Sequence, residues 1–186
     1  MRRLANACTL AAALLLVFPA AAAELAGVRM NDTTGVGGEE LVLNGMGLRK
    51  KLFIKVYVAG LYLPAKQKNG ATILSADTPR RTVMHFLYNV DKGKICGAWD
   101  DSLAANTPKA SGELKAQFKQ LCDAMQDMEK GERMTFTYVP GEGTTVEVGG
   151  KETKPFSGKA FADALWASWV GDEPATGDLK KGMLGG

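Results

Sequence analysis

The strongest hydrophobic patterns in the chain belong to two segments with the character of buried strands. Residues 52–63 and 81–90 are rich in Val, Ile, Tyr, Phe and Met, and both alternating sides of each segment are mostly apolar. β-Branched and aromatic residues favour strands, and apolar side chains on both sides indicate a strand covered on both faces. A shorter apolar run at 41–43 precedes Asn44-Gly45, a typical turn pair, so we expect a short strand that ends there. Residues 71–74 are expected to form a weaker strand or part of a loop.

The spacing of apolar residues becomes helical in the middle of the chain. Apolar positions recur every three or four residues across 92–105 and again across 111–129, which predicts two helices with one apolar side each. Thr107-Pro108 separates them, because proline disfavours helix in the residue before it. We therefore expect an antiparallel helical hairpin that turns near Pro108 and Lys109.

The last third of the chain alternates between both patterns. Residues 133–139 and 144–148 have strand character and are joined by a Gly-rich turn, and 151–155 is a candidate third strand. Ser157 is positioned to cap a helix that runs to Val170, and 179–184 forms a short terminal element. This order predicts an α+β domain with helices packed on one face of a mainly antiparallel sheet.

The first 23 residues have the organisation of a secretory signal peptide. Arg2 and Arg3 precede an apolar run at 10–18, and small residues at 21–23 suit a signal peptidase. The run is too short to span a bilayer, which needs about 20 apolar residues. An N-terminal core helix is the alternative. We expect a leader at 1–23, one domain at 24–186 with no membrane span, and a periplasmic or secreted bacterial protein.

Charge and composition exclude several kinds of partner. The 23 basic and 20 acidic residues give a formal charge of +3, and loss of the leader with its two arginines would leave near-neutrality. Nucleic-acid binding requires a clear basic surplus, so we expect none. His85 is the sole histidine, and paired-histidine or Cys-x-x-Cys spacings are absent, so we predict no metal and no cofactor. His85 is expected to be a core or pocket residue.

Two cysteines, Cys96 and Cys122, lie outside the expected leader. In an antiparallel hairpin the two helices come abreast at positions equidistant from the turn, and each cysteine lies 13 positions from Lys109. Both belong to the apolar side of their helix. In an oxidising compartment we therefore expect a Cys96–Cys122 disulfide, and two free cysteines serving as small core residues are the alternative.

A motif in the first half of the chain resembles the chalcone isomerase fold family. The stretch Leu43-Asn44-Gly45-Met46-Gly47-Leu48-Arg49, followed by the long apolar segment at 53–63, is similar to the exported bacterial chalcone isomerase-like branch. The pattern from Phe161 to Gly185 resembles the closing helices of the family. The resemblance implies an open-faced β-sandwich, in which a large antiparallel sheet carries a layer of helices and a cleft lies between them.

Plant chalcone isomerases cyclise a flavonoid precursor, and the resemblance places five of their site positions in this chain. Arg49 matches the family arginine, whereas Tyr57 stands at the position of a threonine. The positions of a tyrosine, an asparagine and a late Ser/Thr fall near Lys94, Asp101 and Ala162. Because an isomerase needs hydroxyl donors to stabilise an oxyanion, we expect isomerase activity to be absent or negligible.

The fatty-acid-binding branch of the fold resembles this chain in combining an arginine with a tyrosine in the long strand. Arg49 and Tyr57 are therefore the predicted ligand-binding residues, since a guanidinium grips a carboxylate through two charge-assisted hydrogen bonds. The alternative places Arg49 in a surface turn and Tyr57 in the core. A straight strand would separate the two by roughly 26 Å, so a shared site requires the chain to turn between Arg49 and Leu52.

These observations predict a non-catalytic periplasmic binding protein for a small amphipathic ligand such as a fatty acid. An isomerase or lyase of the chalcone isomerase type is the first alternative. The second is a protein that binds haem or another planar ligand in the same cleft, with His85 as axial ligand.

Overall fold

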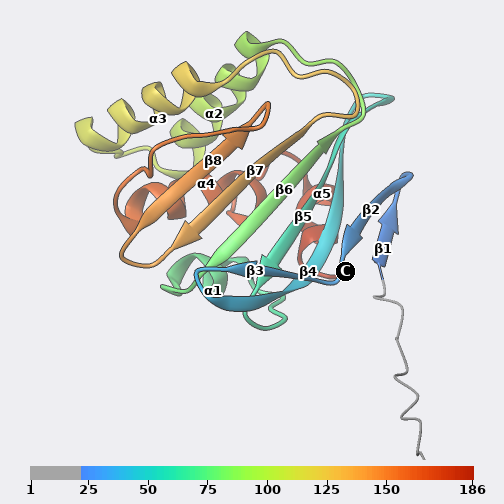
Figure 1. The fold of residues 1–186 in the computed structure, drawn as a ribbon. Coiled ribbons are helices and arrows are strands. Elements are labelled where there is room, and N and C mark those ends of the chain that lie inside the picture. The colour runs from blue at the N-terminus through green and yellow to red at the C-terminus, as the bar shows by residue number, and fades with distance from the viewer. Residues whose placement is uncertain (1–21) are drawn as a thin grey trace, which may run out of the picture.

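A computed structural model describes residues 22–186, so the leader expected at 1–23 lies outside the described residues except for Ala22 and Ala23. One antiparallel sheet of seven strands dominates the fold (Figure 1). Its strands follow the order of the chain: β3 (Thr33–Val36), β4 (Glu39–Lys51), β5 (Ile54–Leu63), β6 (Arg80–Phe86), β7 (Arg133–Val139), β8 (Gly143–Val148) and β9 (Lys151–Glu152). A separate hairpin of β1 (Ala22–Leu25) and β2 (Val28–Asn31) precedes it.

Helices are gathered on one side of this sheet, as Figure 1 shows. They are α1 (Gly70–Ser75), α2 (Lys92–Asn106), α3 (Gly112–Ala124), α4 (Lys159–Val170) and α5 (Gly177–Met183). Among the described residues, no helix has the length and apolar character needed to span a bilayer. The arrangement confirms the predicted α+β architecture.

Two apolar clusters hold the sheet from opposite sides. The larger lies between the sheet and the helices and includes α4, in which Trp166 and Trp169 are fully buried. The smaller lies on the other face, where residues of the β1–β2 hairpin pack against Val58 and Tyr62 of β5. Strand β5 is therefore covered on both faces, as its continuous hydrophobicity predicts.

The expected turn at Asn44-Gly45 is wrong, because β4 continues through it with a register shift between Leu43 and Gly45. The bulge frees Asn44 from pairing with β5, and its buried side chain bonds to two other segments. Nδ2 donates to the carbonyls of Gln67 (3.0 Å) and Met183 (2.7 Å), and Oδ1 accepts from Gln67 N (2.7 Å). A residue typical of turns thus links β4 to the loop after β5 and to α5.

The glycines on either side of Met46 allow α5 to pack directly on β4. A Cβ atom at Gly45 would collide with the carbonyl oxygen of Gly182, and one at Gly47 would collide with that of Leu179. The Gly-x-Gly motif is therefore required by the close approach of a helix backbone to a strand.

Four further predictions of local structure need correction. Residues 71–74 lie in helix α1, which begins because the side chain of Asn69 accepts a hydrogen bond from Thr72 N at 3.0 Å. The third strand is only the two residues of β9. Gly158, with φ of 87°, precedes α4 in place of the predicted Ser157 cap. Strand β6 ends at Phe86 rather than 90, and Val90 instead pairs with Met128 after α3.

The predicted helical hairpin and its disulfide are confirmed, although the second helix ends at Ala124 rather than at 129. Helices α2 and α3 are connected by residues 107–111, and Cys96 is bonded to Cys122 with their Cα atoms 5.2 Å apart. The alternative of two free cysteines is therefore wrong. The bond fixes α2, which forms one wall of the cleft described next.

Candidate functional site

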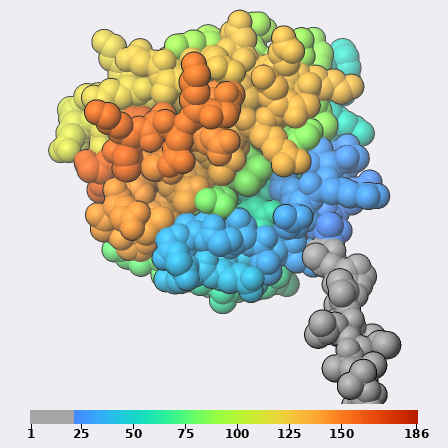
Figure 2. All heavy atoms as spheres, in the orientation of Figure 1, coloured from blue at the N-terminus to red at the C-terminus, as the bar shows by residue number. Residues whose placement is uncertain are grey.

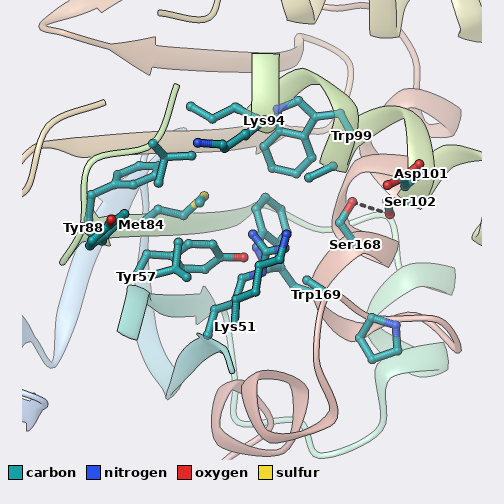
Figure 3. A pocket seen from close by; sticks show the side chains of 18 of the residues that line it. Lys51, Tyr57, Met84, Tyr88, Lys94, Trp99, Asp101, Ser102, Ser168 and Trp169 are labelled. Carbon is teal, nitrogen blue, oxygen red and sulfur yellow. Dashed lines mark hydrogen bonds between the residues drawn. The ribbon is translucent and has the colours of Figure 1, made fainter. Parts of the chain in front are cut away.

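A cleft of about 550 Å³ lies between the sheet and the helix layer (Figure 3). Strands β4, β5 and β6 supply one side of it, and α2, α4 and the loop after α4 supply the other. Its apolar lining includes Ile54, Val56, Met84, Phe86, Ile95 and Trp99. This size and lining are typical of small-molecule sites.

Both predicted ligand-binding residues line this cleft and face each other across the β4–β5 hairpin. Arg49 is the register partner of Tyr57, and its Cζ lies 5.7 Å from the centre of the tyrosine ring. The reversal that the site required occurs slightly later than expected, at Leu52-Phe53, because β4 runs to Lys51.

A second irregularity in the hairpin shapes the same wall. The register shifts between Arg49 and Lys50, so that Val56 has no partner on β4. Val56 and Tyr57 are consecutive in the strand, yet both line the cleft. A bulge of this kind redirects side chains, and here it adds one apolar residue beside the phenol.

Tyr57 is buried and lies against Phe86, with 5.9 Å between the ring centres. Burial raises the pKa of its phenol above the usual value, and the positive charge of Arg49 partly offsets that rise. The phenol is thus neutral at physiological pH and can donate a hydrogen bond into the cleft.

Several nitrogen donors around the cleft lack an acceptor. Nε of Arg49 and the indole Nε1 atoms of Trp99 and Trp169 are buried and have no hydrogen-bond partner among the described residues. None of the ion pairs in that part of the chain involves Arg49. Unmatched buried donors are costly, and a ligand oxygen would relieve that cost where a small side-chain rotation turned one of them toward the cleft.

The cleft contains a pair of hydroxyl groups that the sequence did not predict. Ser102 of α2 donates to Ser168 of α4 at 2.7 Å, and both residues line the cleft (Figure 3). Ala162, the predicted position of the late Ser/Thr, is fully buried and does not line it. The sequence contained one indication of this site, because Ser168 is a polar residue on the apolar side of its helix.

The other two aligned positions, Lys94 and Asp101, do line the cleft. Lys51 and Glu173 line it as well, so the cleft contains two lysines, two carboxylates and Arg49. The formal charges of these five side chains sum to one positive charge. Among residues 22–186 no group of His, Cys, Asp and Glu side chains is arranged to hold a metal ion.

His85 lies on the other face of the sheet. It alternates along β6 with Met84 and Phe86, which line the cleft, and its Nδ1 accepts from Nε of Arg133 at 3.3 Å. Partial burial and the charge of Arg133 lower its pKa. His85 is therefore not available as an axial ligand in this cleft, so that role predicted for His85 is wrong.

Comparison with known proteins adds two findings. A family model described as chalcone isomerase-like matches residues 22–185. The crystal structure of a fatty-acid binding protein of Arabidopsis thaliana is similar, with a TM-score of 0.66 and 16% sequence identity over 88% of this chain and 96% of that one. At this identity the likeness shows a shared fold. No curated protein sequence matches the chain significantly.

Proposed function

Because this chain belongs to the chalcone isomerase-like family, we propose that it is a non-catalytic binding protein for a fatty acid or a similar small amphipathic anion. The observation that carries the proposal is Arg49, a cation beside the phenol of Tyr57 with no carboxylate partner among the described residues.

The proposed carboxylate position follows from the unused donors. Guanidinium groups bind carboxylates through charge-assisted hydrogen bonds, and the phenol of Tyr57 supplies another donor. The indole N–H groups of Trp99 and Trp169 lack acceptors in the same cleft. An anionic head group with two oxygens would accept hydrogen bonds from the guanidinium of Arg49 and the phenol of Tyr57 together.

The acyl chain would lie along the apolar part of the cleft. Ile54, Val56, Met84, Phe86 and Ile95 supply the lining there, and each buried methylene group contributes about 0.8 kcal/mol. The structural relative from Arabidopsis is named a fatty-acid binding protein, which supports the same ligand class for this fold.

We also propose that the protein works in the periplasm or outside the cell. The arrangement of positive, apolar and small residues at 1–23 supports export. The Cys96–Cys122 disulfide supports it independently, because such bonds persist mainly in oxidising compartments. Cell fractionation with mass measurement of the mature N-terminus tests this, and a full-length cytoplasmic product would contradict it.

Calorimetric titration with decanoate tests the ligand proposal, with decanol as the matched ligand that lacks a carboxylate. Decanoate should bind at least tenfold more tightly, because a hydrogen bond to a charged group contributes about 1.5–3 kcal/mol. Equal binding of both compounds, or none, would contradict the proposal. Mass spectrometry of ligands extracted from natively purified protein would then name the bound species.

Isomerase chemistry is the second candidate, and the Ser102–Ser168 pair favours it. The absence of hydroxyl donors was the ground for expecting no activity, but Ser168 and Tyr57 place two hydroxyl groups in the cleft with Arg49. Such donors can stabilise an oxyanion while the phenol group of a chalcone substrate adds to the unsaturated ketone of the same molecule. Chalcone turnover well above the spontaneous rate that is lost in Arg49→Met would establish this activity in place of simple binding.

A further inference from the structure

The β4–β5 hairpin ends in an apolar tip. Leu52 and Phe53 form its two-residue turn and are 88% and 89% exposed. Of the large hydrophobic residues in the described part of the chain, only Tyr88 is also classed as exposed. The hairpin projects at the upper right of Figure 1, and its teal atoms form part of the same edge in Figure 2.

The residues of this turn are unfavourable for its backbone conformation. Leu52 has φ of 56°, in the left-handed region that disfavours residues other than Gly, Asn and Asp. Two-residue hairpin turns strongly prefer Asn-Gly, Asp-Gly or Gly-x for this reason. The chain instead places two large apolar side chains in water at a strained position.

Positive charge surrounds the base of the tip. Lys50 and Lys55 are directly opposite each other across the hairpin, and both are exposed together with Lys51. None of the ion pairs among the described residues involves these lysines. Like charges in register destabilise a strand pair, so this arrangement also opposes folding and favours an anionic partner.

The tip adjoins the candidate ligand cleft. Lys51 and Ile54 flank the turn and line the cleft, while Tyr88 and Lys94 line it from the segment that follows β6 and from α2 (Figure 3). Tyr88 is 51% exposed, and tyrosine is a side chain suited to a lipid–water interface.

We propose that the hairpin tip, residues 50–55, docks on the surface of an anionic lipid bilayer. Leu52 and Phe53 insert between the lipids, and Lys50, Lys51 and Lys55 contact the anionic head groups. An apolar surface flanked by cations is the combination that binds such interfaces. Docking requires no ligand in the cleft. Its consequence, that a fatty acid passes between the bilayer and the adjoining cleft, rests on the proposed function.

Co-sedimentation with vesicles tests the docking. The processed protein is mixed with vesicles of equal parts phosphatidylglycerol and phosphatidylcholine, and all variants carry the same N-terminus, verified by intact mass. Leu52→Asn/Phe53→Gly removes both apolar side chains and introduces the preferred turn pair, so this variant should fold at least as well as the parent. We expect its vesicle affinity to fall at least ~10-fold.

A charge variant separates the electrostatic contribution. Lys50→Gln/Lys55→Gln should weaken vesicle binding by roughly 25-fold, since each lysine near an anionic surface contributes about fivefold. Neither residue lines the cleft. The matched control, Lys115→Gln/Lys119→Gln, removes two exposed lysines from α3 and should leave vesicle binding unchanged. Vesicles of phosphatidylcholine alone should bind the parent weakly.

Insertion is measured with a tryptophan at the tip. The native residues Trp99, Trp166 and Trp169 are buried, so brominated lipids should quench mainly the added fluorophore of Phe53→Trp. Quenching of this variant, with little effect on the parent, is the expected result. An unquenched tip tryptophan would overturn insertion.

Two further outcomes would overturn membrane docking: equal vesicle binding by the parent and Leu52→Asn/Phe53→Gly, or self-association of the parent through this pair with no vesicle binding. Titration of decanoate into both proteins without vesicles keeps the two proposals distinguishable. Decanoate affinity should be the same in both, and its absence in both would count against the proposed function alone.

Discussion

The helix-covered face of the sheet contains the same pair of residues twice, in two different settings. Arg49 is the register partner of Tyr57, and Arg80 is the register partner of Tyr138. Each guanidinium lies over its tyrosine ring, at 5.7 and 5.0 Å. The difference between them is the acidic partner.

Arg80 is neutralised within the fold. It is 1% exposed, donates to Asp163 at 2.6 Å and to the carbonyl of Ile73 at 2.9 Å, and also lies over Trp166. Arg49 has no carboxylate partner among the described residues and borders a cleft. The same cross-strand unit is thus structural where an acid faces it and is available for a ligand where none does.

The largest expected effect comes from breaking the structural pair. Arg80→Met should lower the free energy of unfolding by about 3–5 kcal/mol, because it removes two hydrogen bonds from a buried guanidinium, to Asp163 and to the carbonyl of Ile73, each of which contributes about 1.5–3 kcal/mol. Lys159 still pairs with Asp163 in this variant. Urea denaturation measures this. Arg49→Met is the matched control and should cost less than about 1 kcal/mol. Similar losses in both variants would contradict the distinction between the two sites.

Removal of the disulfide should affect the cleft more than the Arg80 site. Cys96→Ser/Cys122→Ser should destabilise the fold by about 3 kcal/mol, since the bond spans 26 residues. Hydrogen exchange should increase in α2, which lines the cleft, and change little in α4 near Asp163. An equal increase in exchange in α2 and α4 would show that the bond does not stabilise the cleft selectively.

Loss of the unpaired arginine should appear in binding. Arg49→Met should reduce decanoate affinity ~10- to 100-fold, because a charge-assisted hydrogen bond contributes about 1.5–3 kcal/mol, and decanol affinity should stay constant. Calorimetry measures both ligands. Unchanged decanoate binding would assign Arg49 a role outside ligand recognition.

The smallest effect distinguishes the two tyrosines at alkaline pH. Burial and the hydrogen bond to Asp77 raise the pKa of Tyr138 to about 12 from an ordinary value of 10.0. This stabilisation is complete below about pH 10 and is lost as the pH rises to about 12, since the unfolded chain ionises first. Tyr138→Phe should abolish that loss in urea titrations. Arg49→Met should instead raise the pKa of Tyr57 further, as seen by phenolate absorbance.

Local sequence determined the class of fold and the disulfide. Periods of two and of three to four residues located the central strands and the helical hairpin, because these periods reflect backbone geometry that each segment adopts by itself. Equal distances from one turn were sufficient to pair Cys96 with Cys122. The same reasoning failed at Asn44, whose hydrogen bonds to Gln67 and Met183 depend on segments distant in sequence.

Only the tertiary structure decided which arginine is available for a ligand. Arg49 and Arg80 both lie in or next to apolar strands, and nothing near Arg80 in the sequence marks Asp163 as its partner 83 positions away. The meeting of Arg49 with Tyr57 depended on where one hairpin reverses, and the place of Ser168 in the cleft depended on the rotation of α4. Neutralisation of a charge is a property of the assembled core, because it is set by whichever side chain the packing brings within hydrogen-bond distance.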